Sequence, residues 1–287
     1  MNKKILILGC NGLIGNNILK FFKKKKNLSI YAASRKKLNK FLSIKNYYYP
    51  SLTKKSNFKF VKQIIILTNP DFVINCTGIT KHHDNKSKIN QINIQFPEFL
   101  SMLQKKYKFI NIHLSTDCVF SGSTGLYEEN SNTDALDTYG KTKAKIEKIL
   151  LKKQNTIILR TSTIGHEISS RRGLLEWFLH KKGKVFGFQN AFFSGPTTLE
   201  LAKIVYKYIV CKNIIKNDIY NISSTKISKY KLLKLIKIIY KKKSLIVPTS
   251  HIKLNRTLNN TKFLKLTNYR LPSWKKMILD MKNFNVK

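Results

Sequence analysis

The first predicted strand and helix begin with Ile5-Leu6-Ile7-Leu8-Gly9-Cys10-Asn11-Gly12-Leu13-Ile14-Gly15. A short apolar run, a glycine-rich turn and a helical start are typical of units whose helix N-terminus binds a dinucleotide pyrophosphate. We expect Gly9 to form the tight turn, Gly12 to let the phosphates approach the backbone, and Gly15 to let the helix pack on the strand. The spacing is GxxGxxG instead of GxGxxG, so a purely structural turn remains the alternative.

Apolar runs alternate with helical stretches from the glycine turn onward. Strands are predicted near 4–8, 29–33, 46–49, 73–76, 109–115, 157–161 and 219–222. Helices are predicted at 13–25, 57–67, 89–105, 139–152, 174–181, 198–210 and 229–240, with a short one after Trp274. The alternation predicts an α/β fold: a Rossmann-type doubly wound parallel sheet with a smaller C-terminal substrate-binding cap. We expect the nucleotide-binding domain over 1–161 and mainly cap over 162–287, with part of the latter returning to the sheet.

The end of the second predicted strand indicates which dinucleotide binds. Chains that bind NAD usually carry Asp or Glu there, where the carboxylate holds the ribose 2′-hydroxyl. Here Ser34 and Arg35 follow Ala33, and no carboxylate is present. A guanidinium suits a 2′-phosphate, so the sequence favours NADP(H) as the cofactor. The alternative is that Arg35 is one more solvated cation of a basic protein.

A tyrosine and a lysine share one face of the helix predicted at 139–152. Tyr139 and Lys143 are four residues apart in Tyr139-Gly140-Lys141-Thr142-Lys143. A phenol with an ordinary pKa of about 10 is a poor acid–base catalyst at neutral pH, and we expect the neighbouring ammonium to lower that pKa. In most sequences such a pair is only helix surface. Its position after the fifth strand favours catalysis here.

Hydroxyl groups stand at the end of the fifth predicted strand, in Ser115-Thr116-Asp117. Ligands of open α/β folds bind at the carboxyl ends of the strands. The alternative is that these side chains cap the strand end or a turn, which is the more expected role for Asp117.

Together these motifs resemble the extended short-chain dehydrogenase/reductase superfamily, and most closely its dTDP-4-dehydrorhamnose reductase-like branch. The resemblance rests on the glycine turn, on Val73 to Gly78, on Ser115 to Phe120, on Tyr139 to Lys143 and on Leu159 to Ser162. It implies an NADPH-dependent reductase of a keto group on a nucleotide-activated sugar, with Thr116, Tyr139 and Lys143 as the catalytic triad. It also implies that Asn75 to Gly78, Asn93, Thr161 and Ser162 lie against the cofactor.

The expected binding residues follow from these motifs and from the resemblance. Those for NADP(H) are Gly9, Asn11, Gly12, Leu13, Ile14, Gly15, Ser34, Arg35, Asn75, Cys76, Thr77, Gly78, Asn93, Ser115, Tyr139, Lys143, Thr161 and Ser162. Those for the sugar nucleotide are Thr80, Lys81, Thr116, Asp117, Thr163, Arg171, Arg172 and Arg256, with Lys184 as a further diphosphate candidate.

Two segments depart from the pattern of the branch. Thr163 stands where the rhamnose enzymes have an aromatic residue that contacts the sugar, and Thr80-Lys81-His82-His83 replaces a run of small residues. These departures leave the sugar open. Three alternatives also remain: a non-catalytic NADP-binding regulatory subunit of the same fold, a sugar-nucleotide epimerase or dehydratase, and a basic polyanion-binding protein.

The charge of the chain is strongly positive, at +41 over 287 residues, but only six of the 55 basic residues are arginine. The lysines recur between apolar positions on helix faces, which is typical of a solvated surface more than of a nucleic-acid-binding tail. We therefore expect no specific nucleic acid as partner. The surplus charge should favour anionic substrates such as nucleotide-diphosphate sugars.

The remaining composition limits the class of protein. No apolar run approaches the roughly 20 residues that span a bilayer, and the N-terminal apolar run is too short for a signal peptide. The four cysteines, Cys10, Cys76, Cys118 and Cys211, show no ligand spacing, so we predict neither a metal site nor a disulfide framework. We expect a cytoplasmic protein without a membrane partner, with a homodimer as the candidate assembly.

Overall fold

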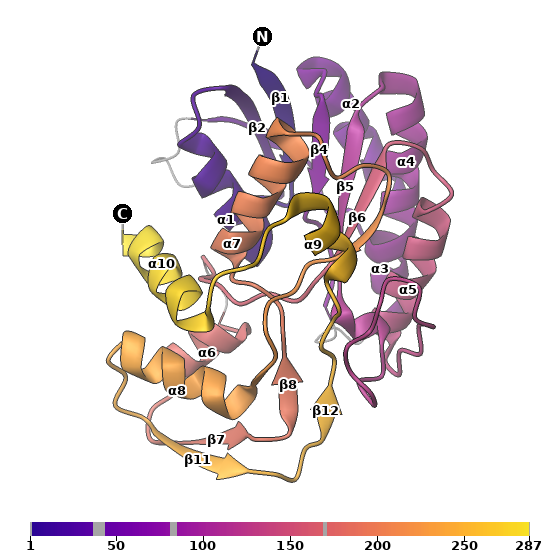
Figure 1. Cartoon of the computed structure of the whole chain (residues 1–287). Helices are drawn as coiled ribbons and strands as arrows, with labels where there is room; N and C mark the ends of the chain where they lie inside the picture. The colour runs from indigo at the N-terminus through magenta and orange to yellow at the C-terminus, as the bar shows by residue number, and fades with distance from the viewer. Residues whose placement is uncertain (1, 37–43, 81–84, 169–170, 287) are drawn as a thin grey trace.

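A seven-stranded parallel sheet forms the centre of the computed structural model, which describes residues 2–36, 44–80, 85–168 and 171–286 (Figure 1). The order of the strands is β3-β2-β1-β4-β5-β6-β9. Their bounds are β1 Lys3–Leu8, β2 Leu28–Ser34, β3 Lys45–Tyr48, β4 Phe72–Asn75, β5 Ile110–Ser115, β6 Thr156–Arg160 and β9 Asp218–Asn221. Each predicted strand is present to within one residue or two. The predicted Rossmann-type sheet is therefore confirmed.

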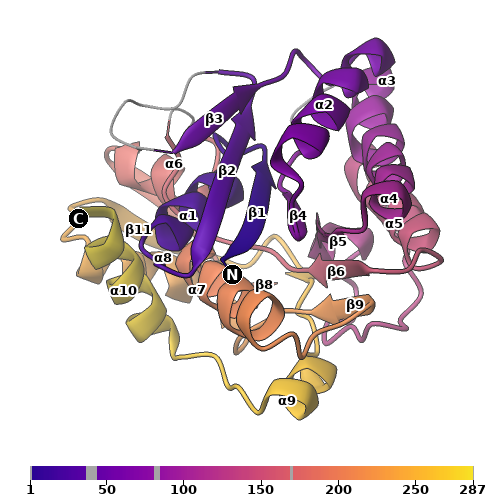
Figure 2. The same ribbon diagram turned by 90° about the horizontal axis from the view of Figure 1, so that it is seen from above.

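Helices cover both faces of this sheet (Figures 1 and 2). They are α1 Leu13–Lys23, α2 Phe58–Thr68, α3 Lys86–Asn90, α4 Phe96–Tyr107, α5 Thr138–Leu150 and α7 Thr198–Ile204. Side chains alternate along a strand, so Ile5 and Ile7 of β1 pack with α1 and α7 while Leu6 and Leu8 pack with α2 and α4. A π-helical turn at Gln91–Gln95 joins α3 to α4, and a second one, Val205–Cys211, continues α7. Short 3-10 turns span Lys55–Asn57 and Asp117–Val119.

The cap has its own small sheets and its own core. Strands β7 Lys184–Phe188 and β11 Leu245–Thr249 pair with each other, and β8 Ala191–Phe193 lies between β10 Ile227–Ser228 and β12 Leu254–Asn255. The cap helices are α6 Leu174–His180, α8 Lys229–Ile239, α9 Thr261–Thr267 and α10 Trp274–Val286. Apolar side chains of α6, α8 and α10 form a core separate from those on the faces of the large sheet. The helices were predicted except α9, whereas these five short strands were not.

The connections between the two halves of the chain place the cap at the edge of the sheet where the parallel strands end. The carboxyl ends of the parallel strands point towards the cap (Figure 1), and β9, from the C-terminal half of the chain, is the seventh strand of the sheet. The loop after β5 is bound to the cap, because Tyr127 pairs with Leu258 and Asn255 donates its backbone N–H to the Gly122 carbonyl at 2.7 Å. The boundary at residue 161 stays a prediction. None of the helices in the described ranges is both long and apolar enough to cross a bilayer.

Candidate active site

The glycine turn after β1 has a geometry that only glycine permits. Gly9 adopts a φ of +74°, and a Cβ atom on it would lie 2.9 Å from the Cys76 carbonyl oxygen. A Cβ on Gly15 would overlap the Gly9 carbonyl, so α1 packs closely on the turn as expected. No side chain caps α1 at Gly12, and its first turn holds no acidic residue. The positive end of this helix therefore suits an anionic group, and the cradle fits a dinucleotide pyrophosphate.

Polar side chains fix the glycine turn to the end of β2. Asn11 donates from Nδ2 to the Ser34 hydroxyl at 3.2 Å and to the Lys36 carbonyl at 3.1 Å. The Ser34 hydroxyl donates to the same carbonyl at 2.6 Å. Arg35, the predicted 2′-phosphate ligand, is exposed beside this link. Tyr49, which was not predicted from sequence, is buried here with its phenol beside the Gly9 backbone.

The loop after β4 is held by two asparagines. Asn75 accepts at Oδ1 from the Thr77 backbone N–H at 3.1 Å and from the Thr77 hydroxyl at 2.6 Å. Asn93 pairs with both backbone groups of Ile79 at 2.9 Å and donates to the Thr142 hydroxyl of α5 at 3.4 Å. The amide of Asn93 thus ties this loop to the helix that carries Tyr139. Gly78 and Thr80 are exposed, and Lys81, His82 and His83 lie outside the described residues.

The end of β5 carries a compact polar cluster. The Thr116 hydroxyl accepts from the Cys118 backbone N–H at 3.1 Å, which caps the 3-10 turn, and donates to Asp117 at 3.2 Å. This hydroxyl also lies close enough to the Tyr139 phenol to lower the pKa of that phenol. The capping alternative is therefore present together with a contact to the tyrosine. Burial raises the pKa of the Asp117 carboxyl above its ordinary value, although Ser162 and Arg256 beside it act in the opposite direction.

The start of α5 is built to place Tyr139 beside this cluster. The Asp137 side chain caps the helix by accepting from the Gly140 backbone N–H at 2.7 Å. A Cβ atom on Gly140 would overlap the Cys118 carbonyl, so only glycine lets the first turn of α5 approach the 3-10 turn this closely. The phenol of Tyr139 consequently meets the hydroxyl of Thr116 across the junction of β5 and α5.

Lys143 lies one turn further along α5 and is 4% exposed. Its Nζ lies 2.8 Å from Nε2 of His113 on β5 and donates to the Leu114 carbonyl at 2.6 Å. Burial lowers the pKa of Lys143 to about 8, while Glu147 acts in the opposite direction. His113 was not predicted from sequence, although a histidine in the middle of a predicted strand is itself a signal.

The pKa of Tyr139 lies above its ordinary value in this structure and not below it, as was expected from the neighbouring Lys143. Burial raises the pKa of Tyr139, Cys118 and Asp117 add to that effect, and the hydrogen bond from Thr116 opposes it. The physical reason is that the contacts of the ε-nitrogen are with His113 and Leu114. The phenol therefore stays protonated at neutral pH, which is the form that can donate a proton.

A buried ion pair supports the site from behind. Glu147 of α5 and Arg160 of β6 pair at 2.8 Å, with each side chain 3% exposed. The Ser115 hydroxyl donates to the same carboxylate. Ser115 was predicted to bind the cofactor, but the structure places its hydroxyl against α5. The ion pair joins the last residues of β5 and β6 to the helix that carries Tyr139 and Lys143.

Only part of the predicted substrate set reaches this cluster. Arg256, from the segment after β12, donates from Nη1 to the Cys118 sulfur at 3.3 Å, and its buried Nε has no hydrogen-bond partner among the described residues. Ser162 lies beside Asp117 and lowers the pKa of its carboxyl, whereas Thr161 donates to the Ile222 carbonyl at 2.8 Å and is buried. Thr163, after these two, is half-buried. The structure shows no contact between the cluster and Arg171, Arg172 or Lys184, which are exposed ahead of α6 and on β7.

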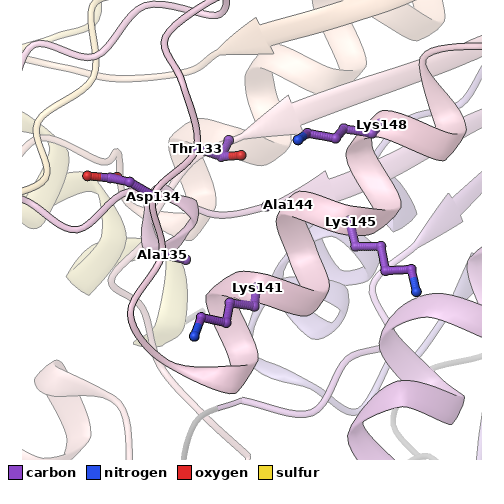
Figure 3. A pocket seen from close by; sticks show the side chains of 7 residues that line it. All are labelled: Thr133, Asp134, Ala135, Lys141, Ala144, Lys145 and Lys148. Carbon is purple, nitrogen blue, oxygen red and sulfur yellow. The ribbon is translucent and has the colours of Figure 1, made fainter.

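The opposite side of α5 is hollowed at the surface. A cavity of about 350 Å³ is lined by Thr133, Asp134, Ala135, Lys141, Ala144, Lys145 and Lys148 (Figure 3). A larger one, of about 770 Å³, lies between α5 and the helices from α3 to α4. Tyr139 and Lys143 line neither of them. These hollows are a lysine-rich surface and are separate from the candidate active site.

Comparison with known proteins agrees with this geometry. The model of the RmlD substrate binding domain family matches residues 3–283. The dTDP-4-dehydrorhamnose reductase of Aggregatibacter actinomycetemcomitans is 25% identical over 227 residues, which are 76% of this chain and 72% of that protein. Methionine adenosyltransferase 2 subunit beta of Bos taurus is 25% identical over 173 residues, 58% of this chain and 48% of that protein.

A solved structure shows the same fold along the whole chain. The dTDP-4-dehydrorhamnose reductase of Bacillus anthracis, determined in complex with NADP, has a TM-score of 0.78 at 18% identity and covers 99% of both chains. Its fold agrees with the one described above. Because the family model covers nearly the full length of the sequence, this chain belongs to the RmlD substrate binding domain family.

Proposed function

We propose that this chain is an NADP(H)-dependent reductase that reduces a keto group on a nucleotide-activated sugar. One observation carries the proposal: the phenol of Tyr139 lies beside the hydroxyl of Thr116, at the sheet edge where the glycine turn also lies. Ligands of open α/β sheets bind at this edge. The dTDP-4-dehydrorhamnose reductases among its relatives and structural neighbours support the same reaction class.

The residues that would hold the cofactor lie along this edge. The turn from Gly9 to Gly15 would take the pyrophosphate, and Arg35 with Ser34 would take the adenosine end. Asn75 to Gly78, with Asn93 behind them, would line the dinucleotide past β4. When bound, NADPH supplies a hydride for the carbonyl carbon of the sugar.

The chain itself would supply the proton and the geometry. Tyr139 would donate its phenolic proton to the oxygen that becomes the alcohol, since burial keeps the phenol protonated. Thr116 would hydrogen-bond the same oxygen and orient the phenol. Lys143, buried one turn away, would provide positive charge when the phenol has lost its proton.

The substrate would enter between the sheet edge and the cap. Arg256 would contact the sugar beside Asp117, because its buried Nε still has an N–H to donate. This differs from the diphosphate contact expected from sequence. The diphosphate would remain for Arg171 and Arg172, with Thr80 and Thr163 nearer the sugar.

A direct assay tests this function. The purified protein is mixed with NADPH and a panel of 4-keto sugar nucleotides, and the loss of NADPH absorbance is followed. We expect oxidation with at least one of them. Binding of NADPH without oxidation of any keto sugar would instead favour a non-catalytic regulatory role. NADPH binding is measured alongside oxidation because methionine adenosyltransferase 2 subunit beta is also among the relatives of this chain.

Assembly and location are part of the proposal. We propose a cytoplasmic enzyme with a homodimer as its candidate assembly. If two copies met through α5, the exposed Lys141, Lys145 and Lys148 of one copy would lie near those of the other, so association should strengthen as salt screens these charges. Light scattering at low and high salt would measure this.

A further inference from the structure

A chain of buried polar side chains runs beneath Tyr139 and ends at Lys143, and its middle member, His113, has no role in the reaction proposed above. Asn75, His113 and Lys143 are 1%, 0% and 4% exposed. Asn75 and His113 are register partners on the neighbouring strands β4 and β5, so their side chains lie on the same face of the sheet. The Nδ2 atom of Asn75 lies 3.4 Å from Nδ1 of His113, whose Nε2 lies 2.8 Å from Nζ of Lys143.

The orientation of the Asn75 amide is fixed by its neighbour. The Thr77 backbone N–H can only donate, and it points at Oδ1 of Asn75 at 3.1 Å. Reversal of the amide would place two donors against each other. The Nδ2 group of Asn75 therefore faces His113, and Nδ1 of His113 has to accept that hydrogen bond.

The proton of His113 is consequently on the other ring nitrogen. Burial and the neighbouring Lys143 lower the pKa of His113 well below its ordinary value, so the ring is neutral and carries one N–H. With Nδ1 accepting, the N–H is at Nε2 and points at Nζ of Lys143. An N–H facing an ammonium N–H is unfavourable, whereas an amine offers a lone pair to it.

We propose that His113 is a positioning residue that presents an N–H to Lys143 and thereby makes the proton on Lys143 easy to remove. This inference rests on the proposed function, because it assigns a role to a residue beneath its catalytic tyrosine. The second contact of Lys143, with the Leu114 carbonyl, is available to amine and ammonium alike. His113 is therefore the contact that distinguishes the two forms.

The other charged groups around Lys143 leave this role to His113. Glu147, one turn further along α5, favours the ammonium, but its carboxylate already pairs with Arg160 of β6 and accepts from Ser115 of β5. Tyr139, one turn before Lys143, is neutral because burial raises its pKa. Burial of Lys143 acts in the same direction as His113 and lowers the pKa to about 8.

A pH profile of turnover tests the role of His113. Loss of the Lys143 proton should give the wild type an alkaline limb near pH 8. In His113→Asn the imidazole N–H next to Lys143 is replaced by an amide that can turn its oxygen towards the ammonium, so the ammonium is favoured and the midpoint of the alkaline limb should rise by about one pH unit or more. Asn75→Asp should shift it in the same direction, because a carboxylate draws the histidine proton to Nδ1 and leaves Nε2 as an acceptor for the ammonium.

Asn111→Leu is the matched control for these variants. Asn111 lies two residues before His113 on the same face of β5 and is fully buried, and among the described residues its amide makes no hydrogen bond to Lys143. Its replacement should lower turnover equally at every pH, if at all. An alkaline limb that stays in place, or falls, in both His113→Asn and Asn75→Asp would overturn the proposal.

A second measurement needs no turnover. Long-range proton–nitrogen correlation spectra of protein labelled with ¹⁵N-histidine distinguish the two neutral tautomers of each of the six histidines. The His113 signal is identified as the one that is lost in His113→Asn. If that variant does not fold, it is identified as the one that changes in Asn75→Asp. We expect the Nε2–H tautomer. The Nδ1–H tautomer would overturn the inference, whereas a chain that oxidises no NADPH would remove the reductase and leave this result standing.

Discussion

The two faces of α5 carry the same residue type in opposite surroundings. Lys143 and Glu147 face the sheet and are almost fully buried, and every polar atom at their ends has a partner. Lys141, Lys145 and Lys148 lie on the opposite face, exposed around a surface hollow (Figure 3). Lys141, Lys145 and Lys148 have the spacing i, i+4 and i+7, which places them on one side of the helix. The buried pair, Lys143 and Glu147, lies on the opposite side.

This difference shows how to choose among many lysines in so basic a chain. A long charged side chain on a helix surface keeps its ordinary solvation at no cost. A buried ammonium loses that solvation, so its pKa falls, as that of Lys143 does. Burial with specific partners therefore indicates a role for Lys143, whereas the lysines of the outer face indicate only charge. Each of the following changes tests that contrast.

Tyr139→Phe should have the largest effect. It removes the proton donor at the start of the inner face and leaves the ring in place, so turnover should fall by at least about a hundredfold. Binding of NADPH, followed by fluorescence titration, should persist. Turnover within a few-fold of the wild type would show that the inner face does not carry the chemistry.

Lys143→Met should follow, with turnover lower by about a hundredfold because a charge near the reacting oxygen is lost. Lys145→Met is the matched control on the outer face of the same helix, and we expect it to stay within about twofold of the wild type. Steady-state NADPH oxidation by both variants measures the difference. Equal losses in the two would contradict the contrast between the faces.

Glu147→Gln should destabilise the fold by about 3 kcal/mol, because Arg160 would keep a buried charge without its counterion. Urea denaturation of the variant gives this value. The control is Lys276→Met, because Lys276 is 60% exposed and its partner Asp280 keeps Lys203 as a second cation. Loss of this lysine should cost about 0–1 kcal/mol. A similar loss of unfolding free energy in both variants would mean that the buried ion pair on the inner face of α5 is no more important for stability than an exposed one.

Arg35→Ala tests whether an exposed cation can also have a function. Arg35 is exposed like the lysines on the outer face of α5, but it stands at the end of β2. We expect the KM for NADPH to rise about tenfold, the scale of one charge-assisted contact, with little change for NADH. Lys26→Ala, an exposed cation before β2, should leave both values as they are. A parallel rise for both cofactors would argue against a 2′-phosphate contact.

Much of the large sheet could be predicted from sequence because its signals are local. The apolar runs of β1, β4 and β5 are long enough to show a strand pattern, and the glycines around Gly12 mark the turn by themselves. The strands of the cap could not be predicted in this way. β10 and β12 have two residues each and exist only because they pair with β8.

The residues of the candidate site likewise divide into those that local sequence signals predict and those that only the packing of the chain brings together. Tyr139 and Thr116 were expected together because both follow β5 in a known order, and the structure brings them into contact. The contact of Lys143 with His113 joins residues 30 positions apart and depends on how α5 lies on β5. Arg256 could not be distinguished from Arg171 and Arg172 by sequence, since only the path of the cap places it beside Cys118.

The most direct test of the account is to follow the hydride itself. The protein is given NADPH deuterated at the transferable position and a 4-keto sugar nucleotide, and the product is analysed by mass spectrometry. The account predicts one deuterium on the carbon that bears the new hydroxyl in the wild type, and almost none formed in the same time by Tyr139→Phe. An unlabelled alcohol, or equal labelling by both proteins, would contradict it.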